Sequence, residues 1–278
     1  MTYYRLLALA AVFCFSSAVA TLAQTVGTQT IAHRGDWMPK GSAQNSRASL
    51  RRALDLGIFG SETDIWLTRD GHIMVNHDRT FQGITPEDTT YAACKKLRLR
   101  NGERMPQLKD LLRILRKSKS PTRLVVEVKD HRLPERSCEC AAAAVAAIRK
   151  YGLEGRVMYI SFSIEACRAL HQLAPQADVA YLSGDRSPAE VHAMGLTGID
   201  YNIKVFRQHP EWVAEAHALG MNVNVWTVDD PEDIKAMQQL GVDYITTNKP
   251  TLCEELVKIM NQPLSNSPEG EGEVKNEE

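Results

Sequence analysis

The sequence predicts an α/β protein, a (β/α)8 (TIM) barrel with a short antiparallel hairpin and a small insertion after the second strand. Short apolar runs typical of strands alternate with amphipathic stretches typical of helices, and this order indicates parallel strands joined by crossovers. Eight such units in about 235 residues match the size of this barrel. A doubly wound open sheet is the alternative, but no glycine-rich phosphate loop follows the first strand.

The elements follow one another regularly along the chain. The eight strand-like runs are "TIAHRG", "GSETDIWL", "RLVVEVK", "RVMYISF", "DVAYLS", "GIDYNI", "MNVNVWTV" and "DYITTN". The helical stretches between them include "SRASLRRALDLG", "QLKDLLRILRK", "CAAAAVAAIRKYG", "IEACRALHQLAP", "PEWVAEAHALG" and "PEDIKAMQQLG". Several of these end on glycine, the usual stop of a helix.

One segment with a strand-like pattern is not among the eight strands of the barrel. "LTRDGHIMVNHD" places Asp70 and Gly71 between two alternating runs, which is a strong hairpin signal. We therefore expect residues 72–77 to run antiparallel to the strand that contains Glu62 and Asp64. Residues 79–107 would form a modest insertion that leads into the next helix.

The two ends of the chain differ from the part between them. Met1 to Ala23 has a single arginine, an apolar run and small residues at a cleavage site, which is the pattern of a secretory signal peptide. An uncleaved membrane anchor is the rival interpretation, since the run approaches the ~20 residues needed to span a bilayer. Residues 263–278 are polar and rich in glutamate, which predicts a disordered acidic tail. The barrel would occupy residues 24–262.

Charge and cysteine content exclude several classes of protein. The chain carries 33 Lys and Arg against 34 Asp and Glu, which gives no electrostatic footprint for nucleic acid. No segment after the signal peptide is apolar enough to span a membrane. The five remaining cysteines are scattered and odd in number, a poor disulfide framework. Cys138 and Cys140 lack the spacing of a zinc knuckle and stand where an alanine-rich helix would open.

In a barrel of this kind the functional site lies at the carboxyl ends of the strands. Three carboxylates, on Glu62, Asp64 and Glu127, are expected there. Glu62 and Asp64 share one face of their strand because side chains alternate with period two. Oxygen ligands favour one hard divalent cation, Ca²⁺ or Mg²⁺. The alternative is a salt-bridge network in which Arg34 and Lys129 neutralise the acids.

Two histidines are expected at the same mouth. His33 ends the first strand and His77 returns with the hairpin, so the two imidazoles could divide the roles of general base and general acid. Arg34 and Lys129 are suited to bind phosphate. Trp226 lies near the end of its own strand, at the same mouth. Together these groups predict chemistry at a phosphoryl oxygen.

Four ordered motifs resemble the glycerophosphodiester phosphodiesterase family. They are "HRG" at 33–35, "ETD" at 62–64, "HD" at 77–78 and "EVK" at 127–129, with "VWTVDD" and "TTNKP" matching later strands. The resemblance implies a barrel with a hairpin insertion and a divalent metal held by Glu62, Asp64 and Glu127. It further implies that His33 and His77 are the acid–base pair and that Arg34 and Lys129 bind the phosphate. Trp226 would form an apolar wall against the alcohol part of the substrate, and the alternative is a plain core tryptophan.

Two positions depart from the pattern of the family. Gln44 stands where a glutamate is usual, and Asn248 stands where an aspartate is common. Asn45 is kept, and we expect it to cap the helix that follows. Neither departure touches the expected metal ligands or imidazoles, so we expect activity to survive.

The sequence therefore predicts an exported, metal-dependent enzyme, periplasmic or extracellular, that hydrolyses small glycerophosphodiesters to sn-glycerol 3-phosphate and an alcohol. Two alternatives stay open. One is a phospholipase-like barrel acting on lipid phosphodiesters, and the other is a binding barrel without turnover, for which Gln44 is the sequence support. The head group, the choice between Ca²⁺ and Mg²⁺ and the oligomeric state stay open as well.

Overall fold

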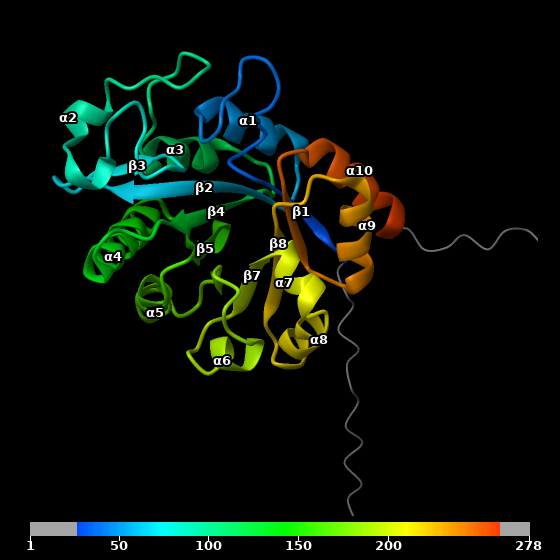
Figure 1. The fold of residues 1–278 in the computed structure, drawn as a ribbon. Helices are drawn as coiled ribbons and strands as arrows, with labels where there is room; N and C mark the ends of the chain where they lie inside the picture. Colours follow the sequence, from blue (N-terminus) through cyan, green and yellow to red (C-terminus); the bar gives the residue numbers. More distant parts are fainter. Residues whose placement is uncertain (1–26, 262–278) are drawn as a thin grey trace, which may run out of the picture.

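A computed structural model describes residues 27–261, in which eight parallel strands close into a barrel (Figure 1). The ring closes because β1 pairs with β9 on one side and with β2 on the other. The eight strands are β1 (Gln29–Ala32), β2 (Gly60–Leu67), β4 (Arg123–Val128), β5 (Val157–Ser161), β6 (Val179–Tyr181), β7 (Gly198–Asn202), β8 (Asn222–Trp226) and β9 (Tyr244–Thr247). The predicted (β/α)8 barrel is confirmed, and the open sheet is wrong.

Helices connect successive strands around the outside of the ring (Figure 1). They are α1 (Arg47–Leu56), α2 (Tyr91–Cys94), α3 (Leu108–Lys117), α4 (Pro134–Tyr151), α5 (Ile164–Leu173), α6 (Pro188–His192), α7 (Ile203–Gln208), α8 (Glu211–Ala218), α9 (Pro231–Leu240) and α10 (Pro250–Asn261). The prediction that α4 opens at Cys138 is wrong. The helix begins at Pro134, a residue whose fixed φ suits the first position of a helix.

Alternating side chains divide each strand between two environments. Those pointing outward pack under the helices and form the main core, with Val126, Tyr159 and Val223 as examples. Those pointing inward from β1 and β4 to β6 fill the barrel with apolar groups: Ile31, Val125, Met158, Ile160, Ala180 and Leu182. By the same alternation, β2 and β7 to β9 direct polar side chains into the barrel. The interior is thus apolar on one side and polar on the other.

The predicted hairpin is present. β3 (Ile73–Val75) pairs antiparallel with the distal half of β2, and both β3 and α2 lie beyond the ring of parallel strands (Figure 1). The connecting turn uses Gly71 at φ +80°, a left-handed conformation that glycine adopts without strain. Phe81 and Ile84 of the insertion pack with Tyr91 against a small core of their own around Met74, Cys94, Leu97 and Met105.

The predicted signal peptide and acidic tail lie outside the described residues. Within residues 27–261, no helix combines the length and the apolar character needed to cross a membrane. The five cysteines of this part are free thiols, Cys94, Cys138, Cys140, Cys167 and Cys253. All of them are buried except Cys138, which is half-buried.

Candidate active site

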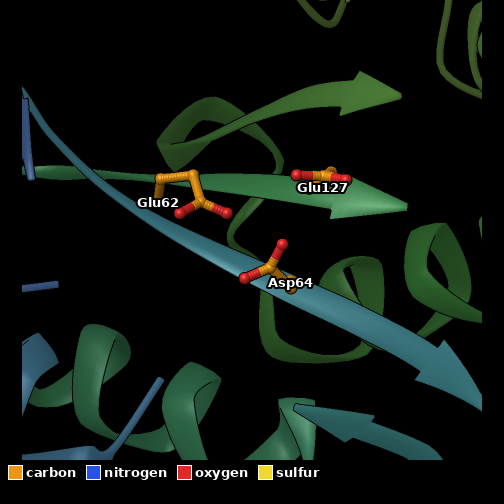
Figure 2. Close-up of side chains that lie close together, drawn as sticks. All are labelled: Glu62, Asp64 and Glu127. Carbon is orange, nitrogen blue, oxygen red and sulfur yellow. The ribbon is translucent and has the colours of Figure 1, made fainter. Parts of the chain in front are cut away.

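The three predicted carboxylates meet at the carboxyl end of the barrel. Glu62 and Asp64 lie along β2, and Glu127 lies on the neighbouring strand β4, opposite Asp64 in the register (Figure 2). One oxygen from each residue lies within 4.8 Å of one oxygen of the others. All three side chains are buried, and Oε1 of Glu62 has no hydrogen-bond partner among the described residues. This oxygen-only cluster could hold a cation.

Two cations contact the cluster, as the salt-bridge alternative predicted. Nζ of Lys129 lies 2.7 Å from Oε1 of Glu127 and 3.2 Å from Oδ1 of Asp64. Nε of Arg34 lies 3.9 Å from Oδ2 of Asp64. Because three carboxylates face only these two cations, one negative charge stays uncompensated when all are ionised. The salt bridges and a cation site are therefore compatible.

The three acids differ in the direction in which their surroundings shift the pKa. Burial, followed by repulsion from Asp64 and Glu127, raises the pKa of Glu62 well above its ordinary value. Burial and Asp64 likewise raise the pKa of Glu127 to about 8. Burial would also raise the pKa of Asp64, but Lys129 and other positive groups lower it below the usual range. Asp64 is thus the permanently ionised member of the cluster, and a bound cation would ionise the other two.

Asn45 positions the acid on β2. Its Nδ2 donates to Oδ2 of Asp64 at 2.7 Å, and its Oδ1 accepts from the Asp64 backbone N–H and the Thr63 hydroxyl. The prediction that Asn45 caps α1 is wrong, because Ser46 is the N-cap and forms a capping box with Ser49. Asn45 itself lies at φ +58°, a left-handed conformation that asparagine tolerates better than most residues.

Replacing Asn45 by alanine is expected to lower the free energy of unfolding by about 2–4 kcal/mol. The buried N–H of Asp64 and hydroxyl of Thr63 would lose their acceptor, and alanine would adopt the left-handed conformation at a cost of ~1 kcal/mol. Urea denaturation measures the loss. Asn45→Gly removes the same hydrogen bonds without the backbone cost, so it should lose about 1 kcal/mol less. Equal losses would show that the conformation at this position carries no cost.

The end of β1 supplies His33 and Arg34, as predicted. The backbone N–H of Arg34 donates to Oε2 of Glu62 at 2.7 Å, and its Nη1 donates to Oε1 of Gln44 at 2.9 Å. Gln44 therefore keeps the arginine oriented with a neutral acceptor. Gly35 follows at φ +76°, and a Cβ at this position would lie 2.8 Å from the backbone carbon of Ser49. Only glycine allows this approach of the loop to α1.

His33 is held in one tautomer. Its Nδ1 lies 2.9 Å from Oδ1 of Asn248, whose Nδ2 donates to Asp229 and thereby fixes the orientation of the amide. Nδ1 must then carry the proton, and Nε2 accepts from Nε of Arg34 at 3.2 Å. Burial and the charge of Arg34 lower the pKa of His33 to about 4. The residue is a neutral imidazole at neutral pH, with Nε2 as its basic nitrogen.

His77 reaches the same mouth through the hairpin. The N–H of Asn76 donates to the carbonyl of Asp64 at 3.1 Å, which returns His77 to the level of the acidic cluster. Its Nδ1 lies 2.7 Å from Oδ1 of Asp78, and its side chain is 35% exposed. His77, like His33, is half-buried and lines the cavity at this mouth.

A cavity of about 150 Å³ joins these groups. Its lining contains six of the eight predicted site residues: His33, Arg34, Glu62, His77, Glu127 and Trp226. Asp64 and Lys129 lie behind the lining, in contact with its carboxylates. Trp226 is half-buried and packs edge to face on Phe162, at 5.7 Å between ring centroids. Trp226 therefore forms a wall of the cavity and also packs against the apolar interior of the barrel.

The sequence reasoning missed Asp200, another carboxyl in the lining of this cavity. It lies in the run "GIDYNI", so the rule of alternation that identified Glu62 and Asp64 could have found it. Its side chain is 1% exposed. Burial raises the pKa of Asp200 to about 7, against a smaller opposing effect of Asn224.

The titration of Asp200 predicts a pH dependence of stability. Because the folded state binds the proton more tightly than the unfolded chain, the residue lowers the free energy of unfolding as the pH rises from about 4 to 7. The effect is on the order of 4 kcal/mol at 1.36 kcal/mol per pKa unit. Asp200→Asn should therefore be more stable than the parent in urea at pH 8 and nearly equal at pH 4. A less stable variant at pH 8 would show that the ionised carboxylate is compensated.

The fold and the site define the chain as a barrel enzyme of the phosphoric diester hydrolase class. Residues 33–252 match the Glycerophosphoryl diester phosphodiesterase family, and the chain belongs to this family. It is 31% identical to the glycerophosphodiester phosphodiesterase of Caldanaerobacter subterraneus subsp. tengcongensis, over 83% of this chain and 98% of that protein.

Solved structures agree with this membership. A glycerophosphodiester phosphodiesterase from Parabacteroides distasonis superposes with a TM-score of 0.83 at 43% identity, over 85% of this chain and 99% of that one. A phosphodiesterase from Oleispira antarctica, solved with the product sn-glycerol 3-phosphate, has a TM-score of 0.70 at 21% identity, over 84% and 97% of the two chains. At 21% identity, the similarity to the Oleispira antarctica structure shows the fold alone.

Proposed function

We propose that this chain is an exported enzyme that hydrolyses glycerophosphodiesters to sn-glycerol 3-phosphate and an alcohol, and that it requires Ca²⁺ or Mg²⁺. The observation that carries the proposal is the meeting of the acidic cluster, two imidazoles and Arg34 around one cavity. Membership of the family supports the same reaction. Export rests on the signal-peptide pattern of residues 1–23.

The charged residues at the mouth would bind the cation and the phosphate. Glu62, Asp64 and Glu127 would hold the cation, which when bound would polarise a phosphate oxygen and neutralise its charge. Arg34 would bind the phosphate through the guanidinium N–H groups that Gln44 orients.

The two imidazoles would act in sequence. His33 accepts the proton of the attacking hydroxyl at Nε2, since Asn248 holds the proton on Nδ1. That hydroxyl is the 2-hydroxyl of the substrate's glycerol. His77, oriented by Asp78, donates a proton to the leaving alcohol. Water then completes the hydrolysis, with the two roles reversed.

The purified protein and a panel of soluble glycerophosphodiesters test the proposal. Release of sn-glycerol 3-phosphate is followed with Ca²⁺, with Mg²⁺ and with a chelator. Release that the chelator abolishes and one of the metals restores supports the proposal and ranks the head groups. Binding of a diester without release under every condition would instead identify a binding barrel. Sequencing the N-terminus of the mature protein locates cleavage and distinguishes export from an uncleaved anchor.

The phospholipase-like alternative finds less support in the insertion. A lipid-active barrel needs apolar side chains exposed at its rim, whereas Phe81 and Ile84 pack inward against Met74 and Cys94. The cavity is also small for a lipid, since pockets for larger ligands measure roughly 300–1,000 Å³. Faster turnover of phospholipid vesicles than of soluble diesters would reverse this ranking.

A further inference from the structure

Asp200 of β7 is a buried carboxyl that the mechanism above does not use. Its Oδ1 has no hydrogen-bond partner among the described residues, although its side chain is only 1% exposed. A buried polar atom without a partner is costly, so it indicates a ligand or a functional constraint. Asp200 lines the same cavity as Glu62 and His77. The missing partner is therefore a group that enters this cavity.

The elements packed around Asp200 supply no cation for it. Asn224 of β8 lies beside it in the register and, as a hydrogen-bonding neighbour, lowers the pKa of the Asp200 carboxyl, and Thr246 of β9 lines the same cavity. These two side chains are hydrogen-bonded to each other, at 3.0 and 3.2 Å. The indole N–H of Trp226 donates to the backbone carbonyl of Asp200, not to its carboxyl. Arg34, the cation in the lining, is engaged by Gln44 and His33.

The lining of the cavity has two parts. One part is the machinery described above: His33, Arg34, Glu62, His77 and Glu127. The other part consists of Asp200, two threonines and four apolar or aromatic side chains: Thr227, Thr246, Ile160, Phe162, Leu182 and Trp226. With a volume of about 150 Å³, the cavity suits one half of a diester together with its phosphate. The second part therefore surrounds the carbon atoms next to that phosphate.

We infer that Asp200 recognises the terminal hydroxyl of the substrate's glycerol half, which donates a hydrogen bond to Oδ1. The inference rests on the proposed function, in which the 2-hydroxyl is used in the reaction and the terminal hydroxyl is free. A substrate whose terminal hydroxyl is acylated, such as a lysophospholipid, has no donor at this position. Asp200 would thus restrict the enzyme to fully deacylated diesters.

A hydroxyl fits the observations better than a cationic head group does. A quaternary ammonium carries no N–H or O–H, so it would leave Oδ1 without a hydrogen bond. Burial raises the pKa of Asp200 to about 7, so the carboxyl is partly neutral near physiological pH. A neutral carboxyl offers little to a cation, whereas it can still accept a hydrogen bond from a hydroxyl.

A pair of substrates that differ in one hydroxyl tests the inference. Glycerophosphocholine is compared with its 1-deoxy analogue, the phosphocholine diester of 1,2-propanediol, which keeps the attacking 2-hydroxyl. The enzymes are the parent, Asp200→Leu, and Asp55→Asn as a control on the exposed face of α1. Thermal melting verifies that each variant is folded.

The parent is expected to prefer the glycerol substrate by about 10²-fold or more in kcat/KM, because a site built for a hydroxyl rejects the analogue that lacks it. Asp200→Leu should lose about this factor on the glycerol substrate and change little on the deoxy analogue, whereas Asp55→Asn should resemble the parent. Equal losses on both substrates would assign Asp200 a structural role and overturn the inference. An unchanged preference for the glycerol substrate in Asp200→Leu would also overturn the inference.

A further substrate and a binding measurement distinguish the remaining outcomes. Glycerophosphoglycerol replaces the cationic head group by a neutral one, and a loss in Asp200→Leu confined to the choline substrate would assign the carboxyl to the head group instead. If the parent turns over no diester, the proposed function fails, and calorimetry then tests Asp200 by itself. Tighter binding of sn-glycerol 3-phosphate than of 1,2-propanediol phosphate, lost in Asp200→Leu, would sustain the inference, and equal affinities would overturn it.

Discussion

Replacing His77 by alanine is expected to remove nearly all turnover of glycerophosphodiesters while the protein stays folded. General acid–base catalysis by one side chain contributes about 10²–10⁴-fold to a rate, and we expect a loss in kcat near the upper end of this range. The fold should tolerate the change because the side chain is 35% exposed and its partner Asp78 faces solvent. Steady-state kinetics and a melting curve measure the two effects.

His72→Ala is the matched control. His72 lies on the same hairpin, where it stacks on Tyr91 and contacts Gln107, but it does not line the cavity. Its replacement should leave kcat within about threefold of the parent, since it has no part in the general acid–base step. A fully active His77→Ala would falsify the assignment of His77.

The leaving group distinguishes an acid from a base. A substrate with a nitrophenol leaving group needs little protonation, so His77→Ala should recover much of its activity on such a diester. If His77 were instead the base, the loss would be equally large on both kinds of substrate. The same comparison with His33→Ala should show no recovery, because the attacking hydroxyl still has to lose its proton.

The barrel and most of its mouth could be predicted from local patterns. Strands and helices alternate at regular intervals, and charges spaced by two within an apolar strand must share one face. That rule found Glu62 and Asp64 and, applied to "GIDYNI", would also have found Asp200. A single acid in a strand, unlike a pair, indicates no metal ligand set, so the sequence alone assigns Asp200 no role.

Other features depend on contacts between distant parts of the chain. Asn45 stands two residues before α1, where a capping role is the natural expectation, yet it donates a hydrogen bond to Asp64 across 19 positions of sequence. Asn248 differs from the family pattern by one amide, and its contact with His33 spans 215 positions. Local spacing carries no information about such pairs. The short helices α6 and α7 were missed because five or six residues show too little periodicity.

Replacing Glu62 by glutamine is expected to abolish cation binding and, with it, turnover. The parent should gain thermal stability when Ca²⁺ or Mg²⁺ is added. At 100 times the dissociation constant the gain is about 2.7 kcal/mol, or roughly 5–10 °C for a domain of this size. Glu62→Gln should show almost no gain, whereas Glu255→Gln, on the exposed face of α10, should respond like the parent.

The metal-free protein should also show the energetic cost of the acidic cluster. Burial and neighbouring carboxylates raise the pKa values of Glu62 and Glu127, the latter to about 8. The folded state therefore holds protons that the unfolded chain releases, and without cation the free energy of unfolding should fall as the pH rises from about 4.5 to 8. Glu62→Gln should reduce this fall and be the more stable protein in chelator at pH 8.

Cation binding should oppose this trend. Because the carboxylates must lose their protons to become ligands, the affinity of the parent for the cation should rise over the same pH range. A parent that gains no stability from either cation at pH 8, and binds neither by calorimetry, would contradict the metal site. Lys129 and Arg34 would then be the only cations in contact with the three acids among the described residues, and Glu62 Oε1 would stay a buried acceptor without a donor.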